Sequence, residues 1–502
     1  MGIEHIVETD VMIVGAGLSG IGAAVHLSKQ CPSKKYLLIE RRQAIGGTWD
    51  LFRYPGIRSD SDMHTLGYNF KPWRAEKAIA DGPSIWDYVN ETADEYQIRD
   101  KIQFGHRLVS AAWDTDSARW TLTVDTEDKG TVYYRCNFLL MCSGYYSYDQ
   151  GHQPEFVGRD DFSGQWIHPQ FWPEDLDYSN KRVVVIGSGA TAMTIVPKMA
   201  ESATKVTMLQ RSPTYVISRP SIDKLANFLR KVLPASWAYD LVRFRNTFWQ
   251  QLVYRRTRTH PAMVAETLLG EVEKAIGDVV DVKKHFTPSY NPWDQRLCLV
   301  PDDDLFTALR SGRADVVTDT IDRITETGVL TASGDHIDAD IIVSATGIEL
   351  LMLGGAEFSV DGNAVNFAEE WTYKGVMCSN IPNMVQTFGY INASWTLRAD
   401  LTAEWVCRVL NHMDEFGYDQ ATPRIPELLA KTMEKRFWID DFSAGYMQRM
   451  MPNFPRQGSR MPWVNPQDYR KDKKMFRGSA IADGALVFTR SKSESAELKV
   501  AS

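Results

Sequence analysis

The sequence GAGLSG occupies residues 15–20, and it decides the fold of this chain. An apolar run at residues 11–14 precedes it and predicts a short buried strand, residues 21–29 favour a helix, and residues 36–39 form a second apolar run. Strand, glycine turn, helix and strand make up the βαβ unit that binds dinucleotides in α/β proteins. The chain is therefore predicted to contain a Rossmann-like domain.

Each glycine of this motif has a separate task in a dinucleotide site. Gly15 allows the tight turn, Gly17 lets the backbone approach a pyrophosphate, and Gly20 lets helix and strand pack closely. The helix that follows offers the N–H groups of its first turn to the anion. Glu40, at the end of the second strand, can accept hydrogen bonds from a ribose. An ordinary turn is the alternative for a glycine motif alone, but here strand, helix and acid are all in place.

The same order of elements returns around GSGATA at residues 187–192, between apolar runs at residues 183–186 and 206–209. Alanine at the third motif position still permits close packing of the helix. The predicted fold class is thus α/β with two Rossmann-like dinucleotide-binding domains. Residues 221–280 differ in character, because apolar residues recur there at helical spacing and arginines supply positive charge, which predicts a helical insertion.

The second unit lacks the acidic residue that ends the corresponding strand of the first. Gln210, Arg211 and Ser212 stand there, so no carboxylate repels a phosphate and one guanidinium can pair with it. This predicts NADPH rather than NADH, and a surface arginine beside a degenerate turn is the alternative. The candidate residues of this second site are Gly187, Gly189, Thr191, Arg211 and Ser212. Two dinucleotides on one chain imply electron transfer from a nicotinamide to a nearby group, most economically a flavin, and both reductases and oxygenases fit that description.

The composition argues against several other classes of protein. The 502 residues carry 56 Lys and Arg against 64 Asp and Glu, a formal charge of −8, so nucleic acid is a poor partner. Six cysteines without a C-x-x-C pair favour reduced thiols in a cytoplasmic protein and argue against a zinc knuckle. Residues 1–10 contain no Lys or Arg, unlike a secretory signal. H-E-x-x-H and G-x-S-x-G are both absent, so neither a metal site nor a serine hydrolase is predicted.

The sequence FSGQWIHPQFWP at residues 162–173 carries the most specific resemblance. It is similar to the F-x-G-x-x-x-H-x-x-x-W-P fingerprint of the type I Baeyer–Villiger monooxygenases, and it lies between the two glycine motifs as in that family. The chain resembles the family over about residues 10–490, and within it the ethionamide-activating subgroup. Further matches are Gly46, Gly47, Trp49, Tyr54, Pro55, Gly56 and Asp60, ATG at residues 345–347, NPWDQR at residues 291–296 and NASWT at residues 392–396.

That resemblance implies both cofactors and a reaction. FAD would lie on the first βαβ unit and NADPH on the second. The enzyme would insert one oxygen atom of O₂ next to a ketone carbonyl through a C4a-peroxyflavin, giving an ester or lactone, with S-oxidation of sulfides or thioamides as a further activity. Gly47, Thr48 and Trp49 would lie near the flavin. Trp395 and Trp463 are the other tryptophans considered for a pocket, although aromatic residues are more often core.

Arg296 occupies the position of the family's active-site arginine. Arginine keeps its proton at working pH, so it can stabilise an anionic peroxide and then the oxyanion of the ketone adduct. Asp60, carried over from the family's aspartate, would orient that guanidinium, and an ordinary interdomain salt bridge is the alternative for both. His168 is expected to be a hydrogen-bonded linker rather than a proton shuttle. Gln295 stands where many relatives carry a lysine that helps bind the 2′-phosphate, so Arg211 must do more of that work.

The resemblance also divides the chain. The expected parts are an FAD-binding domain (first part, 1–150), a linker with the first part of the NADPH-binding domain (151–220), a helical insertion (221–290), the second part of the NADPH-binding domain (291–346), and the rest of the FAD-binding domain with a C-terminal region (347–502). The basic, aromatic insertion could lie peripherally on a membrane, although helices of this kind more often cover a neighbouring domain. Its arginines are Arg243, Arg245, Arg255, Arg256 and Arg258.

Two rival functions stay open at this point. A flavin-containing monooxygenase of the N- and S-oxidising kind shares both glycine motifs and most of the fingerprint, whereas Trp172 and Pro173 favour the Baeyer–Villiger class. A redox sensor that binds flavin and NADPH without turnover is the rival from another class. The expected partners are O₂ and a small ketone or sulfide.

Overall fold

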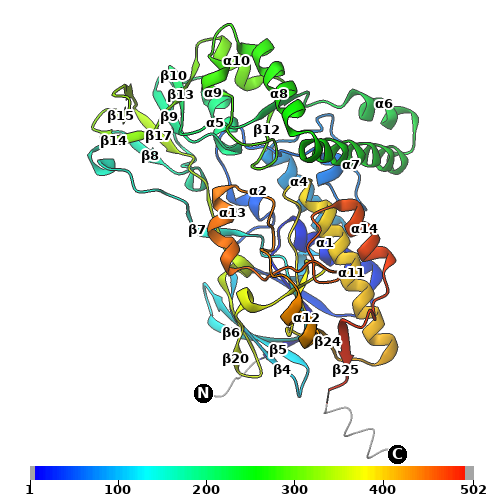
Figure 1. Cartoon of the computed structure of the whole chain (residues 1–502). Coiled ribbons are helices and arrows are strands. Elements are labelled where there is room, and N and C mark those ends of the chain that lie inside the picture. Colours follow the sequence, from blue (N-terminus) through cyan, green and yellow to red (C-terminus); the bar gives the residue numbers. More distant parts are fainter. Residues whose placement is uncertain (1–5, 492–502) are drawn as a thin grey trace, which may run out of the picture.

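The computed structural model describes residues 6–491, which fold into two units stacked one above the other (Figure 1). Residues 1–5, part of the N-terminal stretch whose lack of Lys and Arg argues against a secretory signal, lie outside the described range, as do residues 492–502. Both predicted βαβ units are present, one in each part of the molecule.

The first unit is built on a nine-stranded sheet in the order β20-β19-β4-β5-β6-β1-β2-β3, with β23 also paired to β6. In β1, Val11 and Ile13 enter the core beneath helix α1, whereas Met12 and Val14 enter a second core cluster on the opposite face. A parallel strand covered on both faces is apolar throughout, which explains the run at residues 11–14. The strands are β1 Ile6–Val14, β2 Tyr36–Glu40, β3 Ile102–Phe104, β4 His106–Asp114, β5 Arg119–Thr126, β6 Gly130–Met141, β19 Glu357–Val360, β20 Asn363–Ala364 and β23 Met384–Gln386.

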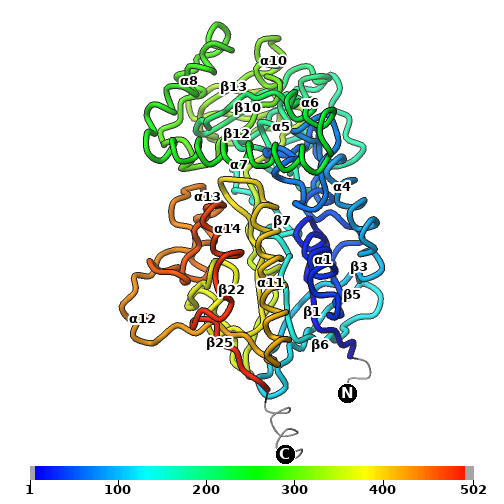
Figure 2. Tube along the Cα trace, turned by 90° about the vertical axis from the view of Figure 1, so that its right-hand side faces the viewer, coloured from blue at the N-terminus to red at the C-terminus, as the bar shows by residue number. Residues whose placement is uncertain are grey.

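Helices from distant parts of the sequence cover this sheet. α1 (Leu18–Gln30) lies beside α11 (Trp395–Phe416), as Figures 1 and 2 both show. α4 (Gly82–Glu95) packs against α1, and α14 (Tyr469–Gly478) packs against α11. The first unit is therefore assembled from both ends of the described chain.

The second unit contains a five-stranded sheet in the order β13-β10-β9-β17-β8, and all its neighbouring strands are parallel. Helix α5 (Ala190–Met199) and helix α10 (Asp304–Arg310) pack against this sheet and against one another. The strands are β8 Gln165–Ile167, β9 Arg182–Ile186, β10 Lys205–Gln210, β13 Ala314–Thr318 and β17 Ile341–Ser344.

A helical segment joins the two units along one side. It comprises α6 (Lys224–Val232), α7 (Ala235–Thr259), α8 (Pro261–Ile276) and α9 (Val282–His285). The long helix α7 lies against α3 of the first unit, and Arg243 of α7 donates hydrogen bonds to the carbonyl oxygens of His64 (2.9 Å) and Gly67 (2.7 Å). The same guanidinium lies 3.3 Å from a carboxylate oxygen of Asp400, so a buried ion pair anchors α7 to the first unit.

The chain passes between the two units at two adjacent places. β7 (Tyr146–Gly151) leaves the first unit and β18 (Ile348–Leu350) returns to it, and the two strands pair antiparallel, with Ile348 opposite Gly151. The second unit is thus an insert whose two ends meet. These crossings lie next to the expected boundaries at residues 150 and 346, and the full division into parts stays a prediction.

The remaining elements are short and mostly connect these units. The strands are β11 Val216–Arg219, β12 Cys298–Pro301, β14 Ile321–Thr325, β15 Gly328–Thr331, β16 His336–Asp338, β21 Thr372–Tyr373, β22 Met377–Cys378, β24 Gln420–Pro423 and β25 Leu486–Thr489. The α-helices are α2 Thr48–Leu51, α3 Met63–Leu66, α12 Glu427–Thr432 and α13 Gly445–Met450, and the 3₁₀ helices are Arg99–Lys101, Arg159–Asp161, Pro169–Phe171, Met352–Gly355, Phe367–Glu369 and Met451–Asn453.

All six cysteines are buried and free. Across residues 6–491, no helix has both the length and the apolar character that crossing a bilayer requires. The same range contains no group of three or more His, Cys, Asp or Glu side chains arranged to hold a metal ion.

Candidate active site

The first glycine loop opens the N-terminus of α1 onto a cavity. Gly15 has φ +106°, and a side chain there would meet the Cys142 carbonyl oxygen at 2.5 Å. The capping residue of α1 is Gly17, and no side chain caps the first turn. The N–H groups of that turn therefore remain available to an anion. Gly20 faces away from the cavity, where a Cβ atom would lie 1.8 Å from the Gly15 carbonyl oxygen, so its role is close packing.

Glu40 lines the same cavity, and it also braces the glycine loop. Its carboxylate accepts hydrogen bonds from the backbone N–H groups of Ala16 (2.7 Å) and Arg42 (2.9 Å). Burial raises the pKa of Glu40, and these N–H groups together with the Arg42 charge partly oppose that rise. A carboxylate has about four acceptor positions, so two remain for a ribose. The bracing role was not predicted from the sequence.

The second glycine loop opens onto this cavity as well. α5 is capped by Gly189 without a side-chain hydrogen bond, and Gly189 and Thr191 line the cavity together with Gly15 and Gly17. The cavity measures about 450 Å³, which lies within the usual range for cofactor and ligand sites. Two uncapped helix N-termini facing one cavity fit two dinucleotide pyrophosphates.

Three candidates of the second site lie outside the cavity lining. Gly187 has φ +135° and is packed against the Ala345 carbonyl oxygen. Arg211 follows β10 directly and is exposed. The Ser212 carbonyl oxygen accepts a hydrogen bond of 3.0 Å from the Ser188 hydroxyl, and this bond connects Ser212 to the glycine loop. Both residues thus flank the loop on the solvent side, and their contact with a cofactor stays a prediction.

Arg296 and Asp60 meet at the cavity. Arg296 lies between α9 and β12, Asp60 lies between α2 and α3, and the distance from Arg296 Nε to Asp60 Oδ2 is 3.6 Å. Partial burial alone would lower the pKa of Arg296, but the acidic groups around it outweigh this effect and raise that pKa. The Asp60 carboxylate is first among these groups, followed by the phenols of Tyr446, Tyr145 and Tyr146. The cavity therefore contains a permanent cation that keeps 40% of its side-chain surface accessible.

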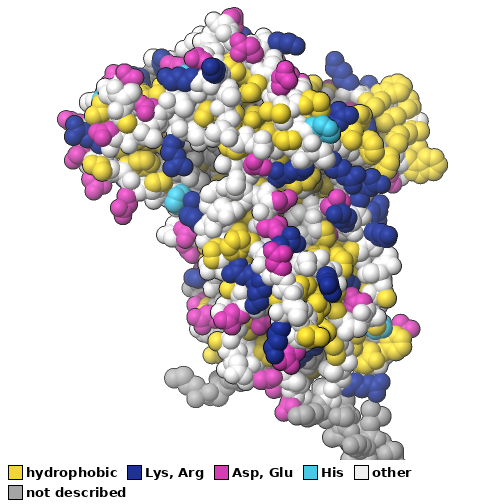
Figure 3. Space-filling model, in the orientation of Figure 1, with side chains coloured by type: hydrophobic (Ala, Val, Ile, Leu, Met, Phe, Trp, Pro, Cys, Tyr) yellow, Lys and Arg dark blue, Asp and Glu magenta, His cyan; other side chains and the backbone are white. Residues whose placement is uncertain are grey.

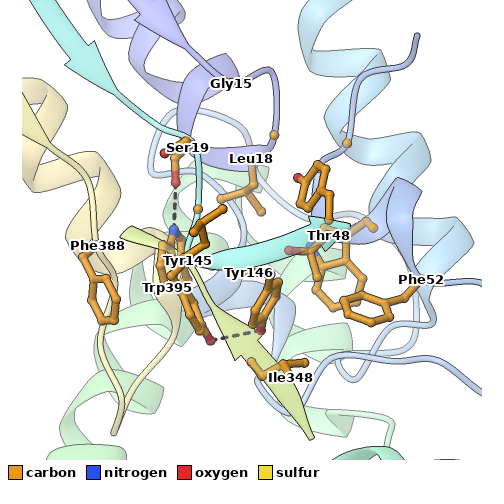
Figure 4. A pocket seen from close by; sticks show the side chains of 18 of the residues that line it. Gly15, Leu18, Ser19, Thr48, Phe52, Tyr145, Tyr146, Ile348, Phe388 and Trp395 are labelled. Carbon is orange, nitrogen blue, oxygen red and sulfur yellow. Dashed lines mark hydrogen bonds between the residues drawn. The ribbon is translucent and has the colours of Figure 1, made fainter. Parts of the chain in front are cut away.

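An aromatic cluster forms part of the cavity wall (Figure 4), and two of its tyrosines, Tyr145 and Tyr146, interact with Arg296. The hydroxyls of Tyr145 and Tyr146 are 3.0 Å apart, and the Tyr145 ring stacks on Trp395 with 5.1 Å between centroids. Trp395 donates a 2.7 Å hydrogen bond to the Ser19 hydroxyl at the start of α1. Burial raises the pKa of Tyr146 to about 12, so its phenol stays protonated near neutral pH. The tyrosines were not predicted from the sequence, although they lie four and five residues after the carboxyl end of β6, where ligand sites form in α/β sheets.

The residues expected near the flavin line the cavity, with one close backbone approach. Gly47, Thr48 and Trp49 are all part of the lining. Gly47 has φ +55°, and a Cβ atom there would lie 3.1 Å from the Gly17 Cα atom, so the two loops touch through glycine backbone. Trp463, in contrast, is buried in the core.

Helix α7 holds the two segments that carry the Arg296–Asp60 pair. Asn246 donates a 2.8 Å hydrogen bond to Asp62, two residues after Asp60. Arg258 donates to the Asp294 carboxylate (2.6 Å), two residues before Arg296, and also to the carbonyl oxygens of Trp293 (3.0 Å) and Asp441 (2.7 Å). One helix therefore fixes both sides of the ion pair.

His168 is hydrogen-bonded on both ring nitrogens, as predicted for a linker. Nε2 lies 3.2 Å from the Gly347 carbonyl oxygen, and Nδ1 accepts a 3.2 Å hydrogen bond from the Gln170 N–H. Burial lowers the pKa of His168, which favours a neutral ring with the proton on Nε2. The histidine thus connects the segment that follows β7 to residues 345–347, which follow β17. Any role in domain movement stays a prediction.

Taken together, the two glycine loops and the cavity that they share fit a flavin-dependent oxidoreductase that binds two dinucleotides. The family model described as flavin-binding monooxygenase-like matches residues 78–448, and a model for NAD(P)-binding Rossmann-like domains matches residues 13–91. The chain belongs to the flavin-binding monooxygenase-like family.

Relatives agree with this assignment, and solved structures share the fold. The chain is 50% identical to the FAD-containing monooxygenase EthA of Mycolicibacterium smegmatis, covering 97% of this chain and 98% of that one. It is 49% identical to the probable FAD-binding monooxygenase AlmA of Acinetobacter baylyi, covering 99% and 98%. A steroid monooxygenase bound to NADP has a TM-score of 0.77 at 24% identity, covering 96% of this chain and 100% of that one. An open crystal structure of cyclohexanone monooxygenase has the same score at 20% identity and the same coverage.

These comparisons confirm several predictions. The resemblance to this group of monooxygenases, the fold class with two Rossmann-like domains and a helical insertion, and FAD and NADP(H) as cofactors are all confirmed. The chain is a flavin-dependent monooxygenase. The NAD(P)-binding model covers the first glycine motif, which the sequence assigns to FAD, because both dinucleotides use the same strand, turn and helix.

Proposed function

We propose that this protein is a Baeyer–Villiger monooxygenase, which uses FAD and NADPH to insert one oxygen atom of O₂ next to a ketone carbonyl and gives an ester or lactone. The observation that carries the proposal is the Arg296–Asp60 pair on the cavity that both glycine loops share. A fixed cation in that place suits a reaction in which negative charge develops on oxygen.

Six buried thiols support a reducing, cytoplasmic location.

Two groups of residues would hold the cofactors. Backbone N–H groups at the start of α1 would bind the FAD pyrophosphate, with Gly15, Gly17, Glu40, Gly47, Thr48 and Trp49 around the rest of the molecule. The start of α5, with Gly187, Gly189, Thr191, Arg211 and Ser212, would bind NADPH. FAD, once reduced by NADPH, supplies the reactivity towards O₂ that amino-acid side chains lack.

The chain's own contribution to the reaction is electrostatic. Arg296 stays protonated and stabilises negative charge on the carbonyl oxygen of a ketone under attack. Asp60 orients the guanidinium through its 3.6 Å contact and partly balances its charge. Tyr145 and Tyr146 keep their protons, so their hydroxyls can donate hydrogen bonds at the cavity wall.

Product analysis tests this proposal directly. Purified protein loaded with FAD is given NADPH and either a methyl ketone or a methyl sulfide, and the products are identified by mass. We expect an ester from the ketone, with NADPH consumption stimulated by the ketone. Sulfoxide without any ester would favour the N- and S-oxidising alternative, and NADPH consumption that the ketone leaves unchanged would favour a redox sensor. S-oxidation of sulfides or thioamides beside ester formation is compatible with the proposal.

The contacts of α7 predict a positioning role for Arg258. In Arg258→Ala the loop that carries Arg296 loses two hydrogen bonds, and the hydrogen bond to the Asp441 carbonyl oxygen is lost as well. We expect product formation to fall roughly tenfold, because small displacements of a catalytic group are costly. The rate of FAD reduction by NADPH and the FAD content should stay close to those of the wild type. Lys274→Ala, at an exposed position on α8, is the matched control. Equal losses in both variants would contradict the role of Arg258.

A further inference from the structure

We propose that the outer faces of α6 and α7 form a docking surface for a phospholipid membrane with anionic headgroups. The apolar band on this surface comprises Phe228 of α6 and Trp237, Leu241, Phe244, Phe248 and Trp249 of α7, each 48–70% exposed. Figure 3 shows it as the large yellow area at the upper right, over the position of α6 and α7 in Figure 1.

The apolar band lies on the face of α7 that points away from the core. Trp237, Leu241, Phe244 and Phe248 follow the spacing i, i+4, i+7, i+11, which places them along one stripe. The buried residues of the same helix, such as Tyr239 and Arg243, lie on another face. Single exposed apolar residues are common on proteins, but a continuous exposed band marks an interaction surface.

Exposed positive charge lies beside the apolar band, on α6 and at the C-terminal end of α7. From α6 to the end of α7, residues 224–259 contain eight Lys and Arg side chains and one acidic side chain, Asp240, in a chain whose formal charge is −8. Four of the cations are exposed, namely Lys224, Lys231, Arg255 and Arg256. This local reversal of sign is complementary to anionic headgroups.

The types of residue fit a bilayer better than a second copy of this chain. Trp and Phe with flanking Lys and Arg are typical of helices that lie in the headgroup region with one face in the acyl chains. Symmetric pairing of two copies through the apolar band would bring their basic side chains together, which is unfavourable. The helices would lie along the membrane surface, since no helix within residues 6–491 is suited to span it.

Vesicle sedimentation tests the proposal with the FAD-loaded, full-length protein. The vesicles contain either phosphatidylcholine alone or phosphatidylcholine with phosphatidylglycerol. We expect the wild type to sediment with the anionic vesicles, at least tenfold more than with the neutral ones, and to be released by salt. Phe244→Gln/Phe248→Gln should lower the bound fraction at least tenfold, and Arg255→Gln/Arg256→Gln should lower it on anionic vesicles only. Val157→Gln/Leu428→Gln removes two exposed apolar residues elsewhere and should bind like the wild type.

Three outcomes would overturn the docking surface. The first is no binding of the wild type to either vesicle, and the second is equal loss in the Phe244/Phe248 and Val157/Leu428 variants. The third is a dimer in sedimentation velocity without lipid that Phe244→Gln/Phe248→Gln dissociates, since a second copy would then cover the apolar band. FAD content and thermal unfolding, measured for every variant, separate loss of binding from loss of fold.

Discussion

Arg296→Ala is expected to abolish most ester formation while FAD is still reduced by NADPH. The guanidinium is a permanent cation on the cavity, and only oxygen transfer to the ketone requires it strongly. Removing one preorganised charge stabiliser of this kind typically costs about 10²–10³-fold in rate. Rapid-mixing absorbance of the flavin measures the reduction step, and product mass measures the ester.

Two controls make this result specific. Arg323→Ala removes an exposed arginine on β14 and should form ester like the wild type. Asp60→Asn keeps the shape of the side chain but removes its charge, so we expect a smaller loss than in Arg296→Ala. A normal ester yield from Arg296→Ala would refute the assignment of this arginine.

Arg211→Ala is expected to raise the KM for NADPH by roughly tenfold or more and to change the KM for NADH by less than about twofold. Arg211 is exposed at the end of β10, beside the second glycine loop, and NADPH differs from NADH only in the 2′-phosphate. Loss of a charge-assisted hydrogen bond has an effect of this size. Steady-state rates with both nucleotides provide the comparison.

The conservative variant sharpens this test. Arg211→Lys retains the charge but not the planar fork of donors, so it should recover part of the preference for NADPH. Arg211 lies outside the lining of the cavity, so a contact with the 2′-phosphate requires that part of the cofactor to extend beyond the cavity. Equal changes of KM for both nucleotides would show that another group reads the phosphate.

The glycine loops were predictable because their signals are local. Each loop, its flanking strands and its helix lie within about 30 residues, and the spacing of the glycines fixes the turn. Periodicity alone also predicted the helices between residues 221 and 280. Arg296 and Asp60 were predicted only through the resemblance, since 236 residues separate them in the sequence.

The parts of the site that escaped prediction depend on long-range packing. The hydrogen bond between Asn246 and Asp62 joins residues 184 positions apart, and no pattern in either segment indicates the other. Tyr145 stacks on Trp395 only because the start of α11 reaches the end of β6. Glu40 was assigned to a ribose, and its second function of holding the Ala16 N–H became visible only in the folded loop.

The paired strands β7 and β18 have a consequence for biosynthesis. All five strands of the second sheet lie between these crossings, whereas the first sheet still needs β19, β20 and β23, which come after them. Chains emerge from the ribosome N-terminus first, and domains fold as units. The inserted unit should therefore complete its fold on the ribosome while the surrounding unit waits for its last strands and for α11, so that the unit whose synthesis begins first is the last to complete its fold.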